Sequence, residues 1–179
     1  MKQGLNAMAA AVFILAVLAS PSYTVPAQAG SADKAAARPP APDVTFLDSS
    51  GATQSLSRYR GKVVLVNLWA TWCAPCIREM PSLDQLQRQL GALGFEVLAL
   101  SQDRGGIDTI RKFYEKQSLK YLKPLADPKG QAAQAFGARG LPTSYLIDSR
   151  GRMVGQMEGA TQWDGPEAMA LIKEVINGL

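Results

Sequence analysis

Histidine is absent from this 179-residue sequence, and cysteine occurs only at Cys73 and Cys76. Without imidazole, the chain cannot supply histidine acid–base catalysis, a Cys–His nucleophile, or a His-ligated metal or haem site. Zinc usually takes four ligands, so a zinc site at the two cysteines would have to recruit carboxylates. We therefore expect no metal and no other cofactor.

A strong net charge is also missing. Lys and Arg number 19 against 15 Asp and Glu, which gives a net charge of +4, and the basic residues form no concentrated stripe. Such a stripe is expected of nucleic-acid-binding proteins, so we expect no nucleic-acid partner. With 47% hydrophobic and 19% charged residues, the chain can bury one ordinary core, and its length favours one domain.

The N-terminal region has the pattern of an export signal. Lys2 precedes an uncharged apolar run at residues 7–19, which is shorter than the roughly 20 residues of a transmembrane helix and fits the core of a secretory signal. The small-x-small pattern that ends at Ala29 predicts cleavage after that residue. Residues 1–29 are thus predicted to be a signal peptide, with an uncleaved membrane anchor as the alternative.

Residues 30–42 are rich in Ala and Pro and contain few large apolar side chains. Such a composition cannot bury enough surface to fold, so we expect a flexible leader to a domain at residues 43–179. Together these segments predict an exported, periplasmic protein, either soluble or held at the inner membrane by residues 5–20.

Beyond the leader, short apolar runs alternate with segments of helical periodicity. Strands are expected at residues 44–47, 63–69, 95–101, 121–125, 145–148 and 153–157, with a polar arm to residue 56 completing an N-terminal hairpin, and helices at residues 74–90, 107–114, 131–136 and 166–176. The run at residues 63–69 is almost continuously apolar, which is typical of a central strand buried on both faces. Pro81 lies inside the first helix and should kink it. This order predicts an α/β sandwich with a mixed sheet.

The Cys73-Ala74-Pro75-Cys76 motif falls where the central strand ends and a helix begins. Backbone N–H groups at a helix N-terminus stabilise a thiolate, so Cys73, exposed on the turn, can attack a disulfide. Cys76, one helical turn deeper, can then resolve the mixed disulfide. Pro75 suits the first helical turn, which needs no N–H from it. A structural disulfide, which would restrain little of the chain in so small a ring, and a chance occurrence are the alternatives to a redox-active pair.

Two further features accompany this motif. We expect Trp69 to be a core side chain and Trp72 to lie partly exposed beside the thiols. Pro142, within Leu141-Pro142-Thr143, precedes a predicted strand. A proline there is either an ordinary strand start or a cis peptide apposed to the site, and the local sequence alone favours trans.

The motif at residues 72–76, Pro81, and the tripeptide at residues 141–143 together resemble the thioredoxin superfamily. The resemblance covers about residues 43–179. It implies a thioredoxin-like three-layer sandwich, with a mixed β-sheet, flanking helices, an extra N-terminal hairpin and a helix–strand insertion at about residues 105–125. It also implies that Pro142 is cis and faces the two sulfurs, where the backbone of its neighbour pairs with an extended substrate segment.

Within the superfamily, the sequence is similar to the exported TlpA-like and ResA-like thiol–disulfide oxidoreductases. The shared features are the signal segment, the hairpin, the insertion and Glu79-Met80-Pro81 after the motif. Asn67 occupies the position of the buried aspartate of cytosolic thioredoxins and cannot relay a proton. Glu79 resembles the glutamate that tunes cysteine pKa in this subfamily, and the alternative is a surface glutamate in an early helical turn.

The resemblance implies a periplasmic dithiol reductase of client disulfides, acting through a mixed disulfide and kept reduced by a membrane electron donor. The implied clients are haem-attachment cysteines in cytochrome c maturation or copper-site cysteines in oxidase assembly. The expected site residues are the nucleophile Cys73, the resolving Cys76, the proton-tuning Glu79, and the substrate-positioning Trp72, Pro75, Leu141, Pro142 and Thr143. A disulfide-forming oxidant and a non-catalytic partner-binding module are the alternatives. A peroxidase would need the Pro-x-x-x-Thr-x-x-Cys setting, which this sequence lacks.

Overall fold

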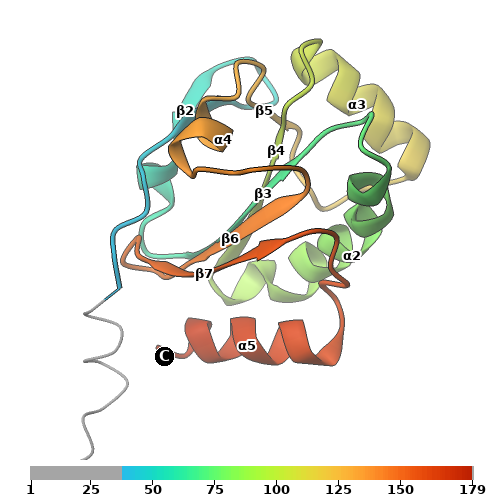
Figure 1. The fold of residues 1–179 in the computed structure, drawn as a ribbon. Coiled ribbons are helices and arrows are strands. Elements are labelled where there is room, and N and C mark those ends of the chain that lie inside the picture. Colours follow the sequence, from blue (N-terminus) through green and yellow to red (C-terminus); the bar gives the residue numbers. More distant parts are fainter. Residues whose placement is uncertain (1–37, 179) are drawn as a thin grey trace, which may run out of the picture.

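The computed structural model describes residues 38–178, whose strands form one mixed sheet with helices on both faces (Figure 1). The strands are β1 (Thr45–Leu47), β2 (Thr53–Ser55), β3 (Val63–Trp69), β4 (Phe95–Ser101), β5 (Leu125–Ala126), β6 (Thr143–Ile147) and β7 (Met153–Glu158). The helices are α2 (Ala74–Leu90), α3 (Gly106–Gln117), α4 (Gln131–Ala135) and α5 (Pro166–Ile176), with short 3-10 turns η1 (Leu56–Tyr59) and η2 (Gly91–Leu93). The strand order is β2-β1-β5-β4-β3-β6-β7.

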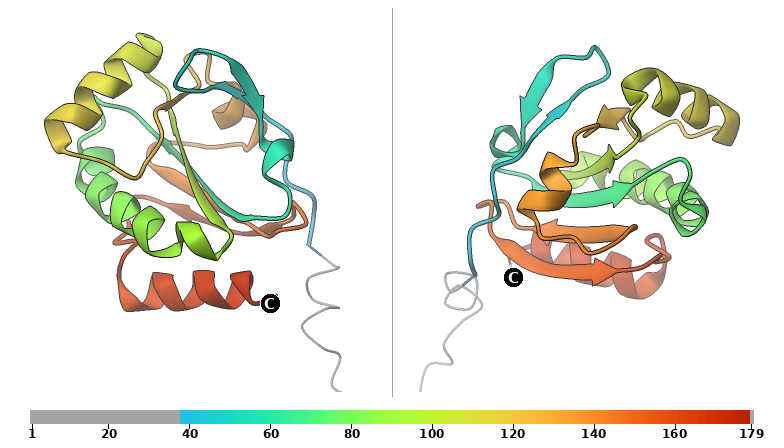
Figure 2. Two further views of the ribbon diagram at one scale, coloured as in Figure 1. Left: turned by 180° about the vertical axis from the view of Figure 1, so that it is seen from behind. Right: turned by 45° about the horizontal axis from the view of Figure 1, so that its top comes forward.

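Strand β3 is the centre of the sheet, as its apolar run predicts. It pairs in parallel with β4 and antiparallel with β6, and all of its residues are buried. Alternate side chains point to opposite faces. One set, which includes Leu65 and Trp69, joins the apolar side chains of α2, α3 and α5, and the other set, which includes Val66, joins those of α4 and the N-terminal hairpin. The three-layer thioredoxin-like sandwich is therefore confirmed (Figure 2).

The predicted signal or anchor at residues 1–29, like residues 30–37 of the leader, lies outside the described residues. The last part of the leader, residues 38–42, differs from the prediction of a flexible segment. It runs beside the β6–β7 hairpin, where Ala41 N donates to Gly151 O at 3.0 Å and Met153 N donates to Pro39 O at 2.9 Å. These are backbone contacts that need no apolar side chain, which is why the composition did not reveal them. Among residues 38–178, no helix is both long and apolar enough to span a membrane.

The insertion after β4 also differs from its prediction. Residues 121–125 were expected to be extended, but strand β5 is only Leu125–Ala126. The backbone N–H groups of residues 120–122 instead donate to the buried carboxylate of Asp84 on α2. Because these donors are used by a side chain, they are not available to a strand. Helix α2 itself continues across Pro81 to Leu90 as one element.

Candidate active site

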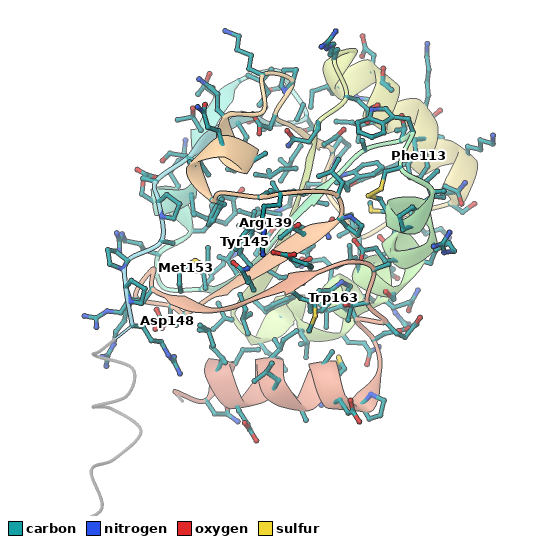
Figure 3. The ribbon with its side chains drawn as sticks, in the orientation of Figure 1. Phe113, Arg139, Tyr145, Asp148, Met153 and Trp163 are labelled. Atoms are coloured by element: carbon teal, nitrogen blue, oxygen red, sulfur yellow. A yellow bond between two sulfur atoms is a disulfide. The ribbon has the colours of Figure 1, made fainter. Side chains whose placement is uncertain are left out.

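The CxxC motif occupies the junction between β3 and α2. Cys73 is the N-cap of α2, and its Sγ accepts a hydrogen bond from the Cys76 backbone N at 3.3 Å. The two sulfurs form a disulfide, which is visible at the start of α2 in Figure 3. Pro75 lies in the first turn of the helix and is half-buried. The structure is therefore that of the oxidised state, with one sulfur placed where helix N–H groups stabilise negative charge.

Both cysteines of the motif are buried, although the residues around them are more accessible. Trp72 is 70% exposed, Cys73 is 7% exposed and Cys76 is fully buried. The expectation that Cys73 is exposed is therefore wrong, because its side chain belongs to the apolar cluster that α2 forms with the sheet. The order is as expected, since Cys73 is the more exposed of the two cysteines. Trp69 is a core side chain that stacks on Tyr114 with ring centroids 5.9 Å apart, whereas Trp72 projects into solvent.

Asp103 fixes the turn that carries the motif, a role that its local sequence did not indicate. Its Oδ2 accepts from Thr71 N at 2.8 Å and from Ser101 Oγ at 2.7 Å, and its Oδ1 accepts from Thr71 Oγ1 at 2.6 Å. The side chain is buried. Its position two residues beyond β4 could have indicated this contact, because the carboxyl ends of the parallel strands β3 and β4 meet at one edge of the sheet.

Replacing Asp103 with Ala is expected to destabilise the fold by about 3 kcal/mol, because a half-buried N–H and two hydroxyl groups would lose their acceptor. Equilibrium urea unfolding measures this change. Asp108→Ala is the matched control, since the Asp108 side chain is exposed and its ion pair within the described residues is with Arg111, a contact typically worth less than about 1 kcal/mol. Equal effects of the two substitutions would contradict this role of Asp103.

The Leu141-Pro142 peptide is cis, as the resemblance implies and contrary to the local expectation of trans. The register pairs Thr143 on β6 with Leu68 on β3, so Pro142 lies beside the end of β3 that leads into the motif. Pro142 is buried, its carbonyl oxygen accepts from Gly159 N at 2.9 Å, and Thr143 Oγ1 donates to Gly140 O at 2.7 Å. The tripeptide is thus brought to the same edge of the sheet as the disulfide.

Glu79 is buried, with 2% of its surface exposed, so the alternative of a surface glutamate is wrong. Its Oε1 accepts from Asn67 Nδ2 at 2.7 Å, and its Oε2 accepts from Thr161 N at 3.1 Å and Trp163 Nε1 at 3.4 Å. No Lys or Arg within residues 38–178 forms an ion pair with it. Burial raises the pKa of the Glu79 carboxyl, and these three hydrogen bonds oppose the shift only in part.

Asn67 links Glu79 to strand β6. Its Nδ2 also donates to Ser144 Oγ at 2.9 Å, while its Oδ1 is buried without a hydrogen-bond partner in the described part of the chain. Ser144, Thr161 and Trp163 were not identified from the sequence. The pairing of β3 with β6 could have indicated Ser144, but nothing local marks the loop after β7 as a partner of α2.

Comparison with known proteins agrees with this geometry. The AhpC/TSA family matches residues 37–155. The thiol-disulfide oxidoreductase ResA of Geobacillus thermodenitrificans is 36% identical over 144 residues, covering 79% of this chain and 81% of the relative. That of Bacillus thuringiensis subsp. konkukian is 35% identical over 120 residues, covering 66% and 68%. A crystal structure described as a DsbE thiol:disulfide interchange protein of Chlorobium tepidum aligns with a TM-score of 0.65 and 31% identity over 78% of this chain and 94% of that one.

Proposed function

Because this chain belongs to the AhpC/TSA family and is a thioredoxin-like thiol–disulfide oxidoreductase of the ResA type, we propose that it works as a periplasmic dithiol reductase. The observation that supports thiol–disulfide exchange is the position of Cys73 Sγ at the N-cap of α2, where it accepts the Cys76 N–H; the reductive direction rests on the resemblance to the exported ResA-like proteins. This arrangement lowers the free energy of a Cys73 thiolate once the disulfide is reduced. A thiolate at neutral pH is what attack on a client disulfide requires.

The reaction runs in two exchanges. The Cys73 thiolate attacks one sulfur of the client disulfide, the client S–S bond breaks, and the second client sulfur leaves as a thiolate that takes up a proton. Cys76 then loses its proton and attacks Cys73 Sγ, which releases the first client sulfur as a thiolate that is protonated in turn. The client gains two electrons and two protons, and the Cys73–Cys76 disulfide described above is regenerated.

Glu79 is the proposed acceptor of the Cys76 proton. It lies three residues after Cys76 on α2, so both side chains belong to one face of the helix. Both are buried, which leaves few other groups to take the proton. A raised pKa brings the Glu79 carboxyl closer to the range in which a proton acceptor works best at neutral pH.

Client binding is assigned to the edge of the sheet around the disulfide. Trp72 offers an exposed aromatic surface beside Cys73, while Pro75, Leu141, Pro142 and Thr143 shape the surrounding backbone. We propose that an extended client segment pairs with the backbone at Leu141. Apocytochrome c haem-attachment cysteines and the copper-site cysteines of an oxidase are the proposed clients, with a membrane dithiol donor returning the electrons. The apolar run at residues 7–19 supports export to the compartment where such clients occur.

The reduction potential of the Cys73–Cys76 pair tests the direction of transfer. Equilibration of the purified protein with dithiothreitol or glutathione is expected to give a value near or below roughly −270 mV, as for thioredoxin. A value near roughly −120 mV would mean that the reduced form is the stabilised one. The protein would then be a disulfide-forming oxidant, and the proposed reductase function would be wrong.

A further inference from the structure

A cavity of about 720 Å³ lies between β7 and α5, on the side of the sheet that also carries α2. Figure 1 shows α5 running below β7. The space is left open because Gly155, on β7, has no side chain, and a Cβ built there would meet no atom within 4 Å. Met157 and Leu171 line the cavity, and each is 48% exposed. Exposed large apolar side chains around a cavity are typical of a binding site.

A buried polar residue lines this apolar space. Ser144 lines the cavity and has only 2% of its surface exposed. Its Oγ accepts from Asn67 Nδ2, and its own O–H finds no acceptor in the described part of the chain. A buried hydroxyl normally donates as well as accepts. While Asn67 Nδ2 donates to the Glu79 carboxylate and to Ser144 Oγ, an acceptor in the cavity would satisfy this O–H.

Some of the residues that line the cavity also belong to the hydrogen-bond network of Glu79. Thr161 and Trp163 line the cavity and donate to Glu79 Oε2, while Ser144 reaches Glu79 Oε1 through Asn67. Any occupant that binds Ser144 is therefore three hydrogen bonds from the carboxylate, through Ser144 and Asn67. No contact between the cavity and either cysteine is needed for this connection.

We propose that the cavity between β7 and α5 binds a neutral small molecule with an apolar body and one hydrogen-bond acceptor, and that Ser144 transmits its presence to Glu79. The volume lies within the roughly 300–1,000 Å³ usual for small-molecule sites. Among residues 38–178, Glu167 is the only charged residue that lines the cavity, so no cationic side chain among them would compensate an anionic group there. Ketones, amides and esters on an aliphatic or aromatic body have the required chemistry.

Prodan, a neutral naphthalene fluorophore with a carbonyl acceptor, is a suitable probe. Its emission should shift to the blue and saturate on titration with the full protein. Gly155→Phe should abolish binding by filling the space. Leu171→Glu, a surface change less able to disturb folding, should weaken binding at least about tenfold, whereas Leu93→Glu, at an exposed leucine outside the cavity, should not. Ser144→Ala should weaken binding about fivefold, the usual effect of one hydrogen bond, and Ser144→Thr should restore it.

A second readout tests the connection to Glu79. Saturation with Prodan is expected to move the Glu79 carboxyl carbon resonance in NMR spectra of the wild type, and to move it less in saturated Ser144→Ala. The NMR experiment bears on disulfide exchange only if Glu79 has the proposed role as proton acceptor. The Prodan binding experiment does not depend on disulfide reductase activity. The reduction potential of the Cys73–Cys76 pair tests the proposed reductase function, and its outcome is independent of the Prodan binding and NMR results.

Three results would overturn the proposal. Absence of saturable binding, or equal binding by the wild type and Leu171→Glu, would remove the site. A Glu79 resonance that stays fixed at saturation would remove the transmission through Ser144. Sedimentation showing a dimer that Leu171→Glu dissociates would assign the apolar surface to a second copy of the chain instead.

Discussion

Cys73→Ser is expected to reduce disulfide exchange to the uncatalysed background. A serine hydroxyl is a weak nucleophile unless a base activates it, and this chain has no histidine to do so. The helix N-terminus that stabilises a thiolate at this position cannot compensate for the much higher pKa of an alcohol. Reduction of a model disulfide such as insulin, with dithiothreitol as donor, measures the loss.

Cys76→Ser is the matched control for this prediction. It keeps the Cys73 thiolate and removes the resolving sulfur, so a covalent adduct between Cys73 and the client should accumulate and be visible by mass spectrometry. Adducts on Cys76 in the Cys73→Ser protein, with none in Cys76→Ser, would reverse the assigned roles. A Cys73→Ser protein that retained both its partner and its phenotype would instead indicate a binding module.

The sequence predicts well those elements whose burial and secondary structure follow from the residues of the element itself. The apolar run of β3 needs burial on both faces wherever the chain goes, and α2 repeats its apolar residues at helical spacing. The segment at residues 120–122 failed as a strand because its N–H groups bind Asp84, a residue distant in sequence on α2. The spacing of apolar residues within a segment carries no information about an acceptor on a distant side chain.

The candidate site likewise has features that can be predicted from the sequence and features that cannot. The CxxC motif and its place at a helix N-terminus can be recognised locally, and the cis state of Pro142 follows from the family resemblance rather than from local preference. The environment of Glu79 could not be predicted. It depends on Thr161 and Trp163, which reach α2 only because the loop after β7 folds over it. Burial and charge state are properties of the whole fold, so a surface glutamate and a buried one have the same local sequence.

Glu79→Gln is expected to slow release of the mixed disulfide about 100-fold at neutral pH, the usual contribution of a positioned proton acceptor. In the wild type, this step should accelerate as the pH rises through the raised pKa of Glu79, because only the carboxylate can accept the Cys76 proton. Glutamine cannot accept it, so the variant should lose that part of the pH profile. Stopped-flow measurement of client release from a preformed Cys73 adduct checks both effects, with Glu174→Gln, at an exposed position on α5, as the control.

The same substitution should have the opposite effect on stability, and this separates the catalytic role from a structural one. The folded-state pKa of Glu79 lies above its usual 4.5, so the folded protein holds this proton more tightly than the unfolded chain does. That stabilisation is complete below about pH 4.5 and is lost as the pH rises through the folded-state pKa. Glu79→Gln, which never ionises, should therefore become progressively more stable relative to the wild type across this window, as measured by urea unfolding.

The hydrogen-bond network can accept the neutral side chain. If the Asn67 amide turns over, its Oδ1, which now has no partner, can accept from the new Gln side-chain amide and from Ser144, while the Gln carbonyl oxygen keeps the Thr161 N–H. Protonated Glu79 can use the same arrangement. A variant that is more stable at high pH but slow to release client would show that the buried carboxylate is kept for proton transfer at a cost to stability. Unchanged release with the wild-type pH profile would show that Glu79 is not the proton acceptor.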